Sequence, residues 1–276
     1  MDDGSVEDLR PLARRFGRAY PLRIDRQPPR GVSAARNRAI RLARARLLAL
    51  HDDDLVPRRE FVAACLAFHA AHPADEDAAL LYFEPDRAIA RDLLVRWAFW
   101  TTRVYPFPTA AGVYNWHYFW SGALTCKKRI FRHGLFDRRY RALEDTELAM
   151  RLSRRLDLRI HFDRTVRSTY VRRMTFVQLY RRTYAMAYYT GVFARDYPRT
   201  FRIREAVYRQ PERHRMPEAE LRAALATVPA LQARLERQRH PGRTEVAMLC
   251  RLWYVALDHA LATGWLDARR RRRFRV

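Results

Sequence analysis

Apolar positions in the first third of the chain alternate between a helical and a strand-like spacing. In Glu7–Tyr20, for example, Leu9, Leu12, Ala13 and Phe16 share one helical face. The same pattern predicts helices at Glu7–Tyr20, Ser33–Leu42 and Arg58–Ala71, and strands at Leu22–Ile24, Arg46–His51 and Ala78–Phe83. Alternating helices and strands of this kind are typical of an α/β unit with largely buried strands.

The middle of the chain is less regular. Leu93–Trp120 is crowded with aromatic residues and contains Pro106 and Pro108. This composition predicts an irregular segment packed over a site, and a buried aromatic segment of the core is the alternative. Regular elements are predicted after it, with helices at Thr146–Leu156 and Phe176–Tyr197 and a short strand at Ile160–Phe162.

Strand signals stop at about Phe201. Helical patterns cover Glu218–Gln238 and Glu245–Leu261, with His240-Pro241-Gly242 between them. We therefore expect an α/β domain over residues 1–200 and a helical appendage over residues 201–276, which carries the basic tail Arg269–Arg273.

Composition adds a strong positive charge to this picture. The 276 residues are 49% hydrophobic, which excludes a mainly disordered chain, and the formal net charge is +24. Of the 54 basic residues only Lys127 and Lys128 are lysine. Arginine binds phosphate with a planar fork, so the partners suggested are a nucleotide, a nucleic acid or lipid head groups. A gene of high G+C content explains the same arginine bias without any function.

The cysteines and the apolar runs bear on the location of the chain. Cys65, Cys126 and Cys250 have no paired spacing, which argues against a disulfide framework and a cysteine-rich zinc module. No apolar run reaches the roughly 18 residues of a membrane span, and Met1–Gly4 does not resemble a secretory signal. We expect a reduced, cytoplasmic protein.

One predicted strand runs directly into three carboxylates, Asp52, Asp53 and Asp54. Packed like charges are unfavourable unless something offsets them, and a divalent cation with oxygen ligands does so. A bound Mg²⁺ or Mn²⁺ could in turn hold phosphates. In the alternative interpretation Asp54 caps the following helix and the other two carboxylates are solvated.

Two further features are weak when taken alone. Glu144-Asp145 opens a predicted helix, where acidic residues are ordinary complements of the helix dipole, although a carboxylate in a cleft can also act as a general base. Gly31–Asn37 is a glycine loop that leads into a helix with Arg36 one turn in, and its amides and guanidinium could bind an anion.

Taken in order, these segments resemble the family 2 glycosyltransferases of the GT-A fold. The segments that carry the resemblance are Asp2–Ser5 ("DDGS"), Gly31–Asn37 ("GxSxARN"), Asp52–Pro57 (the DXD motif), Phe119–Lys128 with the "GxFD" turn Gly134–Asp137, and Glu144–Leu148 with Arg151-Leu152 ("EDxxLxxRL"). They span about residues 1 to 195.

The resemblance implies a fold with a mixed, mostly parallel sheet flanked by helices, followed here by the helical appendage. Family members begin with a strand, a helix and a second strand that ends at the "DDGS" turn, whereas this chain begins at Met1. We therefore expect an N-terminally truncated domain that lacks about 35 to 40 residues, through a misassigned start site or because the chain is a fragment.

The resemblance also implies roles at the matching positions. Asp145 would deprotonate the acceptor hydroxyl for in-line attack with inversion, and Glu144 would support it. Asp52 and Asp54 would form the DXD pair that binds Mn²⁺ or Mg²⁺, with Asp54 as the more direct metal ligand. The other nucleotide-sugar contacts implied are Asp3, Arg36, Asn37, Asp53 and Gly122, together with Asp52. Many members carry a His where this chain has Arg167–Arg172, and an Asn where it has Ala123.

The implied function is a metal-dependent, inverting transfer of a hexosyl or related sugar. The donor would be a nucleotide-diphosphate sugar, and the acceptor a glycan or lipid-linked hydroxyl of a cell-envelope polysaccharide. The basic appendage would add peripheral contact with the anionic inner face of the plasma membrane. The alternative is a non-catalytic basic protein that binds anionic membrane or nucleic acid. No recognisable nucleic-acid module is present, which argues against nucleic acid.

Overall fold

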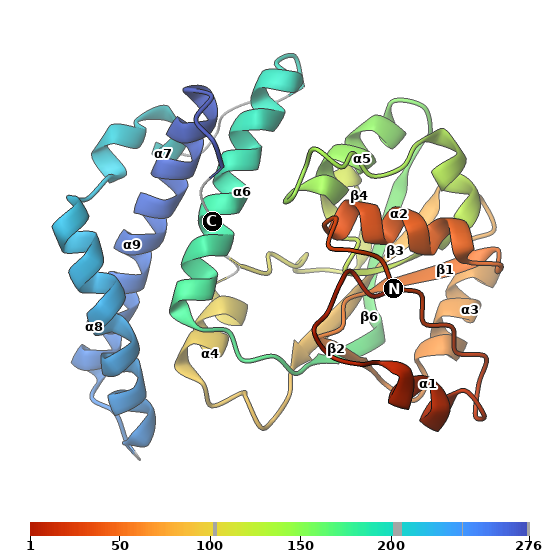
Figure 1. The fold of residues 1–276 in the computed structure, drawn as a ribbon, viewed down its shortest axis with the longest axis horizontal. Coiled ribbons are helices and arrows are strands. Elements are labelled where there is room, and N and C mark those ends of the chain that lie inside the picture. Colours follow the sequence, from red (N-terminus) through yellow and green to blue (C-terminus); the bar gives the residue numbers. More distant parts are fainter. Residues whose placement is uncertain (102–103, 201–205, 239, 275–276) are drawn as a thin grey trace. The chain divides into compact units, whose positions relative to one another are not determined.

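The computed structural model describes residues 1–101, 104–200, 206–238 and 240–274 (Figure 1). The chain folds into two compact units. Unit 1 comprises Met1–His51, Cys65–Leu80 and Gly112–Phe162, and unit 2 comprises Asp52–Ala64, Leu81–Ala111 and Asp163–Val276. The division therefore falls within elements, and it does not coincide with the boundary near residue 200, which stays a prediction.

The strands of the described residues form one sheet. They are β1 (Leu47–His51), β2 (Leu55–Pro57), β3 (Asp77–Pro85), β4 (Gly112–Tyr114), β5 (Ala123–Lys127) and β6 (Arg159–Tyr170). The order is β1-β5-β3-β6-β2, and β4 pairs with β6. All five residues of β5 are buried, because this strand lies between β1 and β3. Central strands buried on both faces read as continuous apolar runs.

The sheet is mixed, as expected. The pairs β1–β5, β3–β5, β2–β6 and β4–β6 are antiparallel. Strand β5 runs antiparallel to both β1 and β3, for example with Leu48 opposite Cys126. The strands β1 and β3, which α3 connects, therefore run in the same direction, and β5 is inserted between them. At the start of β3 and β6 the N–H of Arg159 donates to the carbonyl of Glu76, and at their end the N–H of Asp86 donates to the carbonyl of Tyr170. These two strands therefore also run in the same direction. The expected mixed sheet is confirmed, whereas the mostly parallel arrangement implied by the resemblance is not found: β5 is antiparallel to β1 and β3, and β2 and β4 are antiparallel to β6.

Helices surround the strands of unit 1. Figure 1 shows α1 (Arg10–Phe16), α2 (Val32–Leu42) and α5 (Glu144–Ser153), and the short 3-10 helices η1 (Trp116–Tyr118) and η2 (Lys128–His133) belong to the same unit. Helix α3 (Phe61–Ala71) belongs to unit 1 from Cys65 onward. Predicted α2, α3 and β1 are confirmed within a few residues. The predicted strand Leu22–Ile24 is wrong, because these residues have no ladder partner and only Arg26 forms a bridge, with Asp2.

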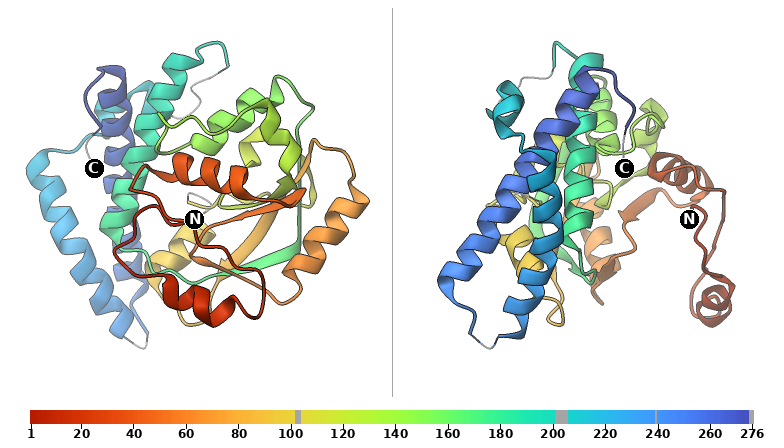
Figure 2. Two further views of the ribbon diagram at one scale, coloured as in Figure 1. Left: turned by 45° about the vertical axis from the view of Figure 1, so that its right-hand side comes forward. Right: turned by 60° about the vertical axis from the view of Figure 1, so that its left-hand side comes forward.

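Helices dominate unit 2. They are α4 (Leu93–Trp100), α6 (Phe176–Asp196), α7 (Ala206–Arg209), α8 (Glu218–Arg237) and α9 (Arg243–Arg269), with the short η3 (Pro211–His214). Figures 1 and 2 show α6, α8 and α9 side by side in every view. Their shared core includes Leu94, Trp97, Phe176, Leu235 and Trp253. Residues 201–205, 239 and 275–276 of the predicted appendage lie outside the described residues.

Two sequence predictions for the middle of the chain need correction. The aromatic segment does not begin irregularly, because Leu93–Trp100 is a regular helix whose N-terminus is capped by Asp92. The predicted strand Ile160–Phe162 is only the start of the twelve-residue β6. Among the described helices, none has the length and apolarity that crossing a lipid bilayer requires.

Candidate functional site

The acidic pair Glu144-Asp145 opens α5, directly after a residue with a strained backbone. Leu143, which precedes the pair, has a φ of 58°, a left-handed conformation that is uncommon for a residue with a side chain. The Glu144 side chain is buried, and Asp145 is partly exposed. The N–H of Thr146 donates to Asp145 Oδ1 at 2.7 Å, and the N–H of Ser121 donates to Oδ2 at 3.3 Å. Asp145 is therefore held by backbone amides from two segments.

Burial raises the pKa of both carboxyls in this pair. For Glu144 the negative charge of Asp145 adds to the increase, and Arg36 opposes it. For Asp145 the charge of Arg36 and the amides of Thr146 and Ser121 oppose the effect of burial without cancelling it. Two close carboxyls with raised pKa values are typical of a site that holds or accepts a proton.

Arg36 of α2 is bound to this acidic pair. Its Nη1 donates to Glu144 Oε1 in an ion pair whose side chains are 15% and 10% exposed, and its guanidinium lies 5.9 Å from the centre of the Phe136 ring. The sequence predicted a contact between Arg36 and a nucleotide. The structure places it against the carboxylate expected to support the base, and its contact with a nucleotide stays a prediction.

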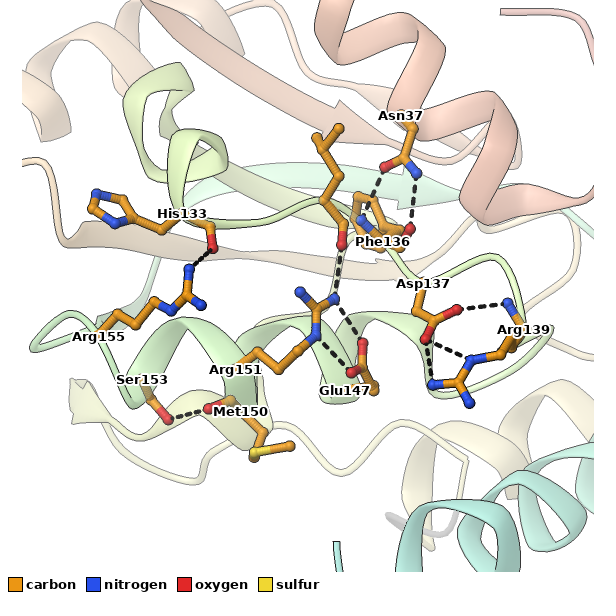
Figure 3. A network of polar contacts seen from close by, with 11 residues as sticks. Asn37, His133, Phe136, Asp137, Arg139, Glu147, Met150, Arg151, Ser153 and Arg155 are labelled. Atoms are coloured by element: carbon orange, nitrogen blue, oxygen red, sulfur yellow. Dashed lines mark hydrogen bonds and ion pairs between the residues drawn. The ribbon is translucent and has the colours of Figure 1, made fainter. Parts of the chain in front are cut away.

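Asn37, one residue further along α2, holds the turn before α5. Its Nδ2 donates to the carbonyl of Phe136 at 2.8 Å, and its Oδ1 accepts from the N–H of Phe136 at 2.9 Å (Figure 3). The hydroxyl of Ser33 donates to the carbonyl of Tyr140 in the same loop. Asn37 is 5% exposed. This geometry favours a positioning role for Asn37, and its contact with the nucleotide sugar stays a prediction.

A second clamp ties the same turn to α5. Arg151 binds the fully buried Glu147 through Nε at 2.6 Å and Nη2 at 2.8 Å, and the same Nη2 donates to the carbonyl of Leu135 at 2.7 Å (Figure 3). A Cβ on Gly134 would lie 2.8 Å from Arg151 Nη1, so the turn passes close to the guanidinium. The sequence analysis gave Glu147 and Arg151 no role, although their i, i+4 spacing on a helix is a signal of such a pair.

The predicted base-binding residue Asp3 holds a loop. Its Oδ1 accepts from Gln27 Nε2 at 2.7 Å and from the N–H of Arg30 at 2.9 Å, and its Oδ2 accepts from the N–H of Gly31 at 2.7 Å. Removal from water raises its pKa, but these three hydrogen bonds outweigh that effect and lower it. Asp3 therefore positions the glycine that precedes α2, and a contact with a base stays a prediction.

Gly122 and its neighbour Ser121 form the turn before β5. Gly122 is partly buried, and Ser121 is fully buried. The hydroxyl of Ser121 has no hydrogen-bond partner among the described residues, while its N–H reaches Asp145. The sequence analysis singled out Gly122 but not Ser121, whose backbone is the part that contacts the acidic pair.

The three aspartates of the DXD segment belong to unit 2. Asp52 and Asp53 are exposed, Asp54 is half-buried, and they form the turn between β1 and β2. Burial raises the pKa of Asp54, the charges of Asp52 and Asp53 raise it further, and Arg172 lowers it. Three hard oxygen donors with mutual repulsion are a set that fits a divalent cation.

The end of β6 contributes to the surroundings of this segment. The N–H of Val171 donates to the carbonyl of Asp54 at 2.9 Å, and Arg172 follows directly. The chain thus places a guanidinium near Asp54 in the stretch where many members of the resembled family have a histidine.

An arginine of α6 also belongs to this environment and was missed by the sequence analysis. Arg182 Nη1 donates to the hydroxyl of Tyr105 at 3.3 Å, and its charge interacts with that of Asp52. No sequence motif marks Arg182, because only the return of α6 brings it to the aspartates.

The comparisons with known proteins agree with the family resemblance. The profile described as Glycosyl transferase family 2 matches residues 1–134. No curated protein sequence matches the chain. Among solved structures, Staphylococcus aureus TarS 1–349 in complex with UDP-GlcNAc is similar with a TM-score of 0.50 and 12% identity, over 99% of this chain and 82% of that one.

Two other TarS structures show the same likeness. The complex of TarS 1–349 with UDP has a TM-score of 0.49 and 13% identity over the same shares of both chains. A longer TarS structure has a TM-score of 0.49 and 12% identity, over 96% of this chain and 48% of that one. The likeness with a TM-score of 0.50 supports a GT-A-like fold, with an α/β sheet flanked by helices. The N-terminal segment, residues 1–134, thus matches glycosyltransferase family 2, and this match supports glycosyltransferase activity.

Proposed function

We propose that the chain is an inverting, divalent-metal-dependent transferase that moves a hexosyl or related sugar from a nucleotide-diphosphate sugar to a hydroxyl of a glycan or lipid-linked acceptor. The observation that carries the proposal is Asp145, which two backbone amides orient and whose pKa is raised by burial. A carboxylate of this kind is suited to accept a proton at a pH where an ordinary aspartate is a weaker base.

The proposed step balances through residues of this chain. Asp145 takes the proton of the acceptor hydroxyl, the hydroxyl oxygen forms a bond to the anomeric carbon, and the bond from that carbon to the diphosphate oxygen breaks. Attack on the face opposite the leaving group inverts the configuration. Glu144 and Arg36 set the charge around Asp145.

Asp52 and Asp54 are the proposed ligands of Mn²⁺ or Mg²⁺, with Asp54 the more direct one. A bound dication supplies positive charge for the diphosphate leaving group. Asp53 and Gly122 are proposed to contact the nucleotide sugar. Arg172 and Arg182 add fixed positive charge near the aspartates, which supports the binding of an anionic donor.

A uridine-diphosphate sugar is the donor class to test first, because the similar TarS structures contain UDP and UDP-GlcNAc. We expect calorimetric titration of UDP to show binding that depends on Mn²⁺, with dTDP as the comparison. Asp54→Asn should remove the Mn²⁺ dependence. Asp145→Asn should keep nucleotide binding and lower sugar transfer or donor hydrolysis by about 100-fold or more.

The matched control is Asp8→Asn, a change of the same type at an exposed residue that pairs with Arg10. It should leave binding and turnover unchanged. If Asp145→Asn retains full turnover while remaining folded, Asp145 is not the base.

Peripheral contact with an anionic membrane on the cytoplasmic side, made by the tail Arg269–Arg273, is a separate proposal. Arg270 pairs with Glu212 and Arg272 pairs with Asp267, so part of the tail charge is already neutralised. Binding to vesicles that contain phosphatidylserine should fall with increasing salt. Binding that does not depend on salt would contradict this contact.

A further inference from the structure

Two histidines and an aspartate meet at one end of the sheet in unit 1. His72 directly follows α3, Asp77 is the first residue of β3, and His161 is the third residue of β6. One potential ligand atom from each side chain lies within 4.8 Å of the other two.

This His72–Asp77–His161 cluster is separate from the acidic pair of α5. Ala78 pairs with Cys126, so Asp77 starts β3 beside the last residue of β5, Lys127. Ser121, whose amide contacts Asp145, lies just before the first residue of β5. The five residues of β5, with a rise of about 3.4 Å per residue, separate these two ends by roughly 14 Å.

The contacts within the cluster leave ligand atoms available. Asp77 is 4% exposed, and its Oδ1 accepts from His161 Nε2 at 2.8 Å and from Arg159 Nε at 2.8 Å. Its Oδ2 accepts no hydrogen bond from the described residues. The imidazole of His72 also forms no hydrogen bond within that part of the chain, although its ring lies 4.1 Å from that of His161, centre to centre.

The neighbouring histidine is not available to the cluster. His69 Nε2 is in hydrogen-bond contact with the hydroxyl of Thr125 at 3.0 Å. Its pKa is lowered to about 4, by burial first and then by the charge of Lys127. His69 is therefore a neutral core residue, and the cluster has three protein ligands.

We propose that His72, Asp77 and His161 bind a transition-metal dication of the Zn²⁺ class. Two imidazoles and a carboxylate are ligands that Zn²⁺ accepts in tetrahedral sites, with water as the fourth ligand, whereas Mg²⁺ and Ca²⁺ prefer oxygen alone. Two cations lie beside the cluster, Arg159 on Asp77 and Lys127 on the carbonyl of His72. They disfavour an ion held by charge alone, so coordination by imidazole nitrogen is required.

Binding would rearrange one proton. When His161 coordinates through Nε2, its hydrogen bond to Asp77 Oδ1 is lost, and the neutral ring carries its proton on Nδ1. Arg159 stays on Oδ1 as an outer partner that orients the carboxylate. The ion would join the end of α3 to the first residues of β3 and β6. It would therefore stabilise unit 1 rather than take part in sugar transfer.

The test uses the full-length chain with Asp54→Asn as the background, which removes the proposed catalytic metal ligand. Equilibrium dialysis should show one Zn²⁺ per chain, which excess Mg²⁺ does not displace, and Zn²⁺ should raise the melting temperature. His72→Gln should lower the affinity for Zn²⁺ by at least about tenfold. His133→Gln, the same change at an exposed histidine outside the cluster, should leave it unchanged.

His72→Cys keeps a metal ligand and should retain Zn²⁺ binding, which covers the case in which His72→Gln does not fold. The proposal is overturned if the Asp54→Asn chain binds no Zn²⁺, or if His72→Gln binds it as well as the background does. Because the background lacks Asp54, these outcomes do not depend on whether the proposed sugar transfer is correct.

Discussion

The guanidinium of Arg36 on α2 binds the buried carboxylate of Glu144 at the start of α5. The adjacent Asp145 shares this one positive charge, since Arg36 lowers the pKa of both carboxyls against the effect of burial. The two carboxyls thus titrate as one system under the charge of Arg36, and a change in any of the three residues should be visible in the titration of the pair.

Arg36→Gln should raise the pKa values of Glu144 and Asp145 further, by about one unit or more, because the opposing positive charge that acts on both is lost. The acidic limb of the pH–activity profile should move to higher pH. A ¹³C titration of the side-chain carboxyls measures the same shift without substrate. The same change at the exposed Arg38, Arg38→Gln, is the control.

The raised pKa values of Glu144 and Asp145 also determine how the free energy of unfolding changes with pH. Both carboxyls have folded-state pKa values above their ordinary values, so their contribution to the free energy of unfolding is fully present below the ordinary carboxyl pKa. It is lost as the pH rises through the raised folded-state values. Arg36→Gln should therefore weaken the fold more at pH 8 than at pH 4, and an equal loss at both values would contradict the linkage.

Glu144→Gln should have the opposite effect on Asp145. The amide oxygen can still accept from Arg36, but the negative charge beside Asp145 disappears. The pKa of Asp145 should fall by about one unit, and the acidic limb of activity should move to lower pH. An unchanged acidic limb would mean that another group than Asp145 controls it.

Sequence reasoning located the elements whose local pattern is strong. The helical spacing of α2, α6 and α8 and the apolar run of β1 were enough to predict them. Strand β5 was not predicted, because Ala123–Lys127 was read as part of a small-residue motif. Only its pairing with β1 and β3 makes it a strand. Helix α4 was not predicted either, because its many aromatic residues suggested an irregular segment although Asp92 is a good N-cap.

For the candidate site, the sequence located residues better than their contacts. Asp145 and Glu144 were found together with Arg36, yet nothing local shows that Arg36 reaches Glu144, because 108 positions separate them. Asn37 is of a residue type that often binds ligands, but its side-chain amide forms hydrogen bonds with the backbone of Phe136. Long-range partners of this kind follow from the packing of α2 against the loop before α5.

Two glycines with nearly equal φ should respond differently to alanine. Gly4 has a φ of 85°, and a Cβ there would lie 2.5 Å from Pro29 Cδ, while Gly31 has a φ of 87° and a Cβ there would meet no atom within 4 Å. Gly31→Ala should cost about 1–3 kcal/mol of folding free energy from backbone strain alone, because φ 87° with ψ 162° is a conformation essentially restricted to glycine. Gly4→Ala should cost about 2–5 kcal/mol, because overpacking is added.

Urea denaturation of the two variants measures this difference directly. Equal losses would mean that Pro29 moves away freely and that the "DDGS" turn is not packed against it. The comparison is internal, since both variants carry the same change at nearly the same φ.

Gly264→Ala should destabilise unit 2, although alanine normally favours a helix over glycine by about 1 kcal/mol. Gly264 lies in α9, and a Cβ there would clash with the carbonyl oxygen of Tyr184 and lie 3.0 Å from the backbone nitrogen of Tyr188, both in α6. The two helices also meet through the hydroxyl of Tyr184, which donates to Asp267 Oδ2 at 2.9 Å. Alanine at position 264 would force α6 and α9 apart and weaken this bond.

The matched control for this helix pair is Gly242→Ala at the start of α9. A Cβ at Gly242 would approach nothing closer than 3.4 Å, and the φ of −61° suits alanine. Its effect on the free energy of unfolding should stay within about 0.5 kcal/mol. Chemical denaturation followed by circular dichroism separates the two variants. A stabilised Gly264→Ala chain would show that helix propensity outweighs the close approach, and α6 and α9 would then not be packed through this glycine.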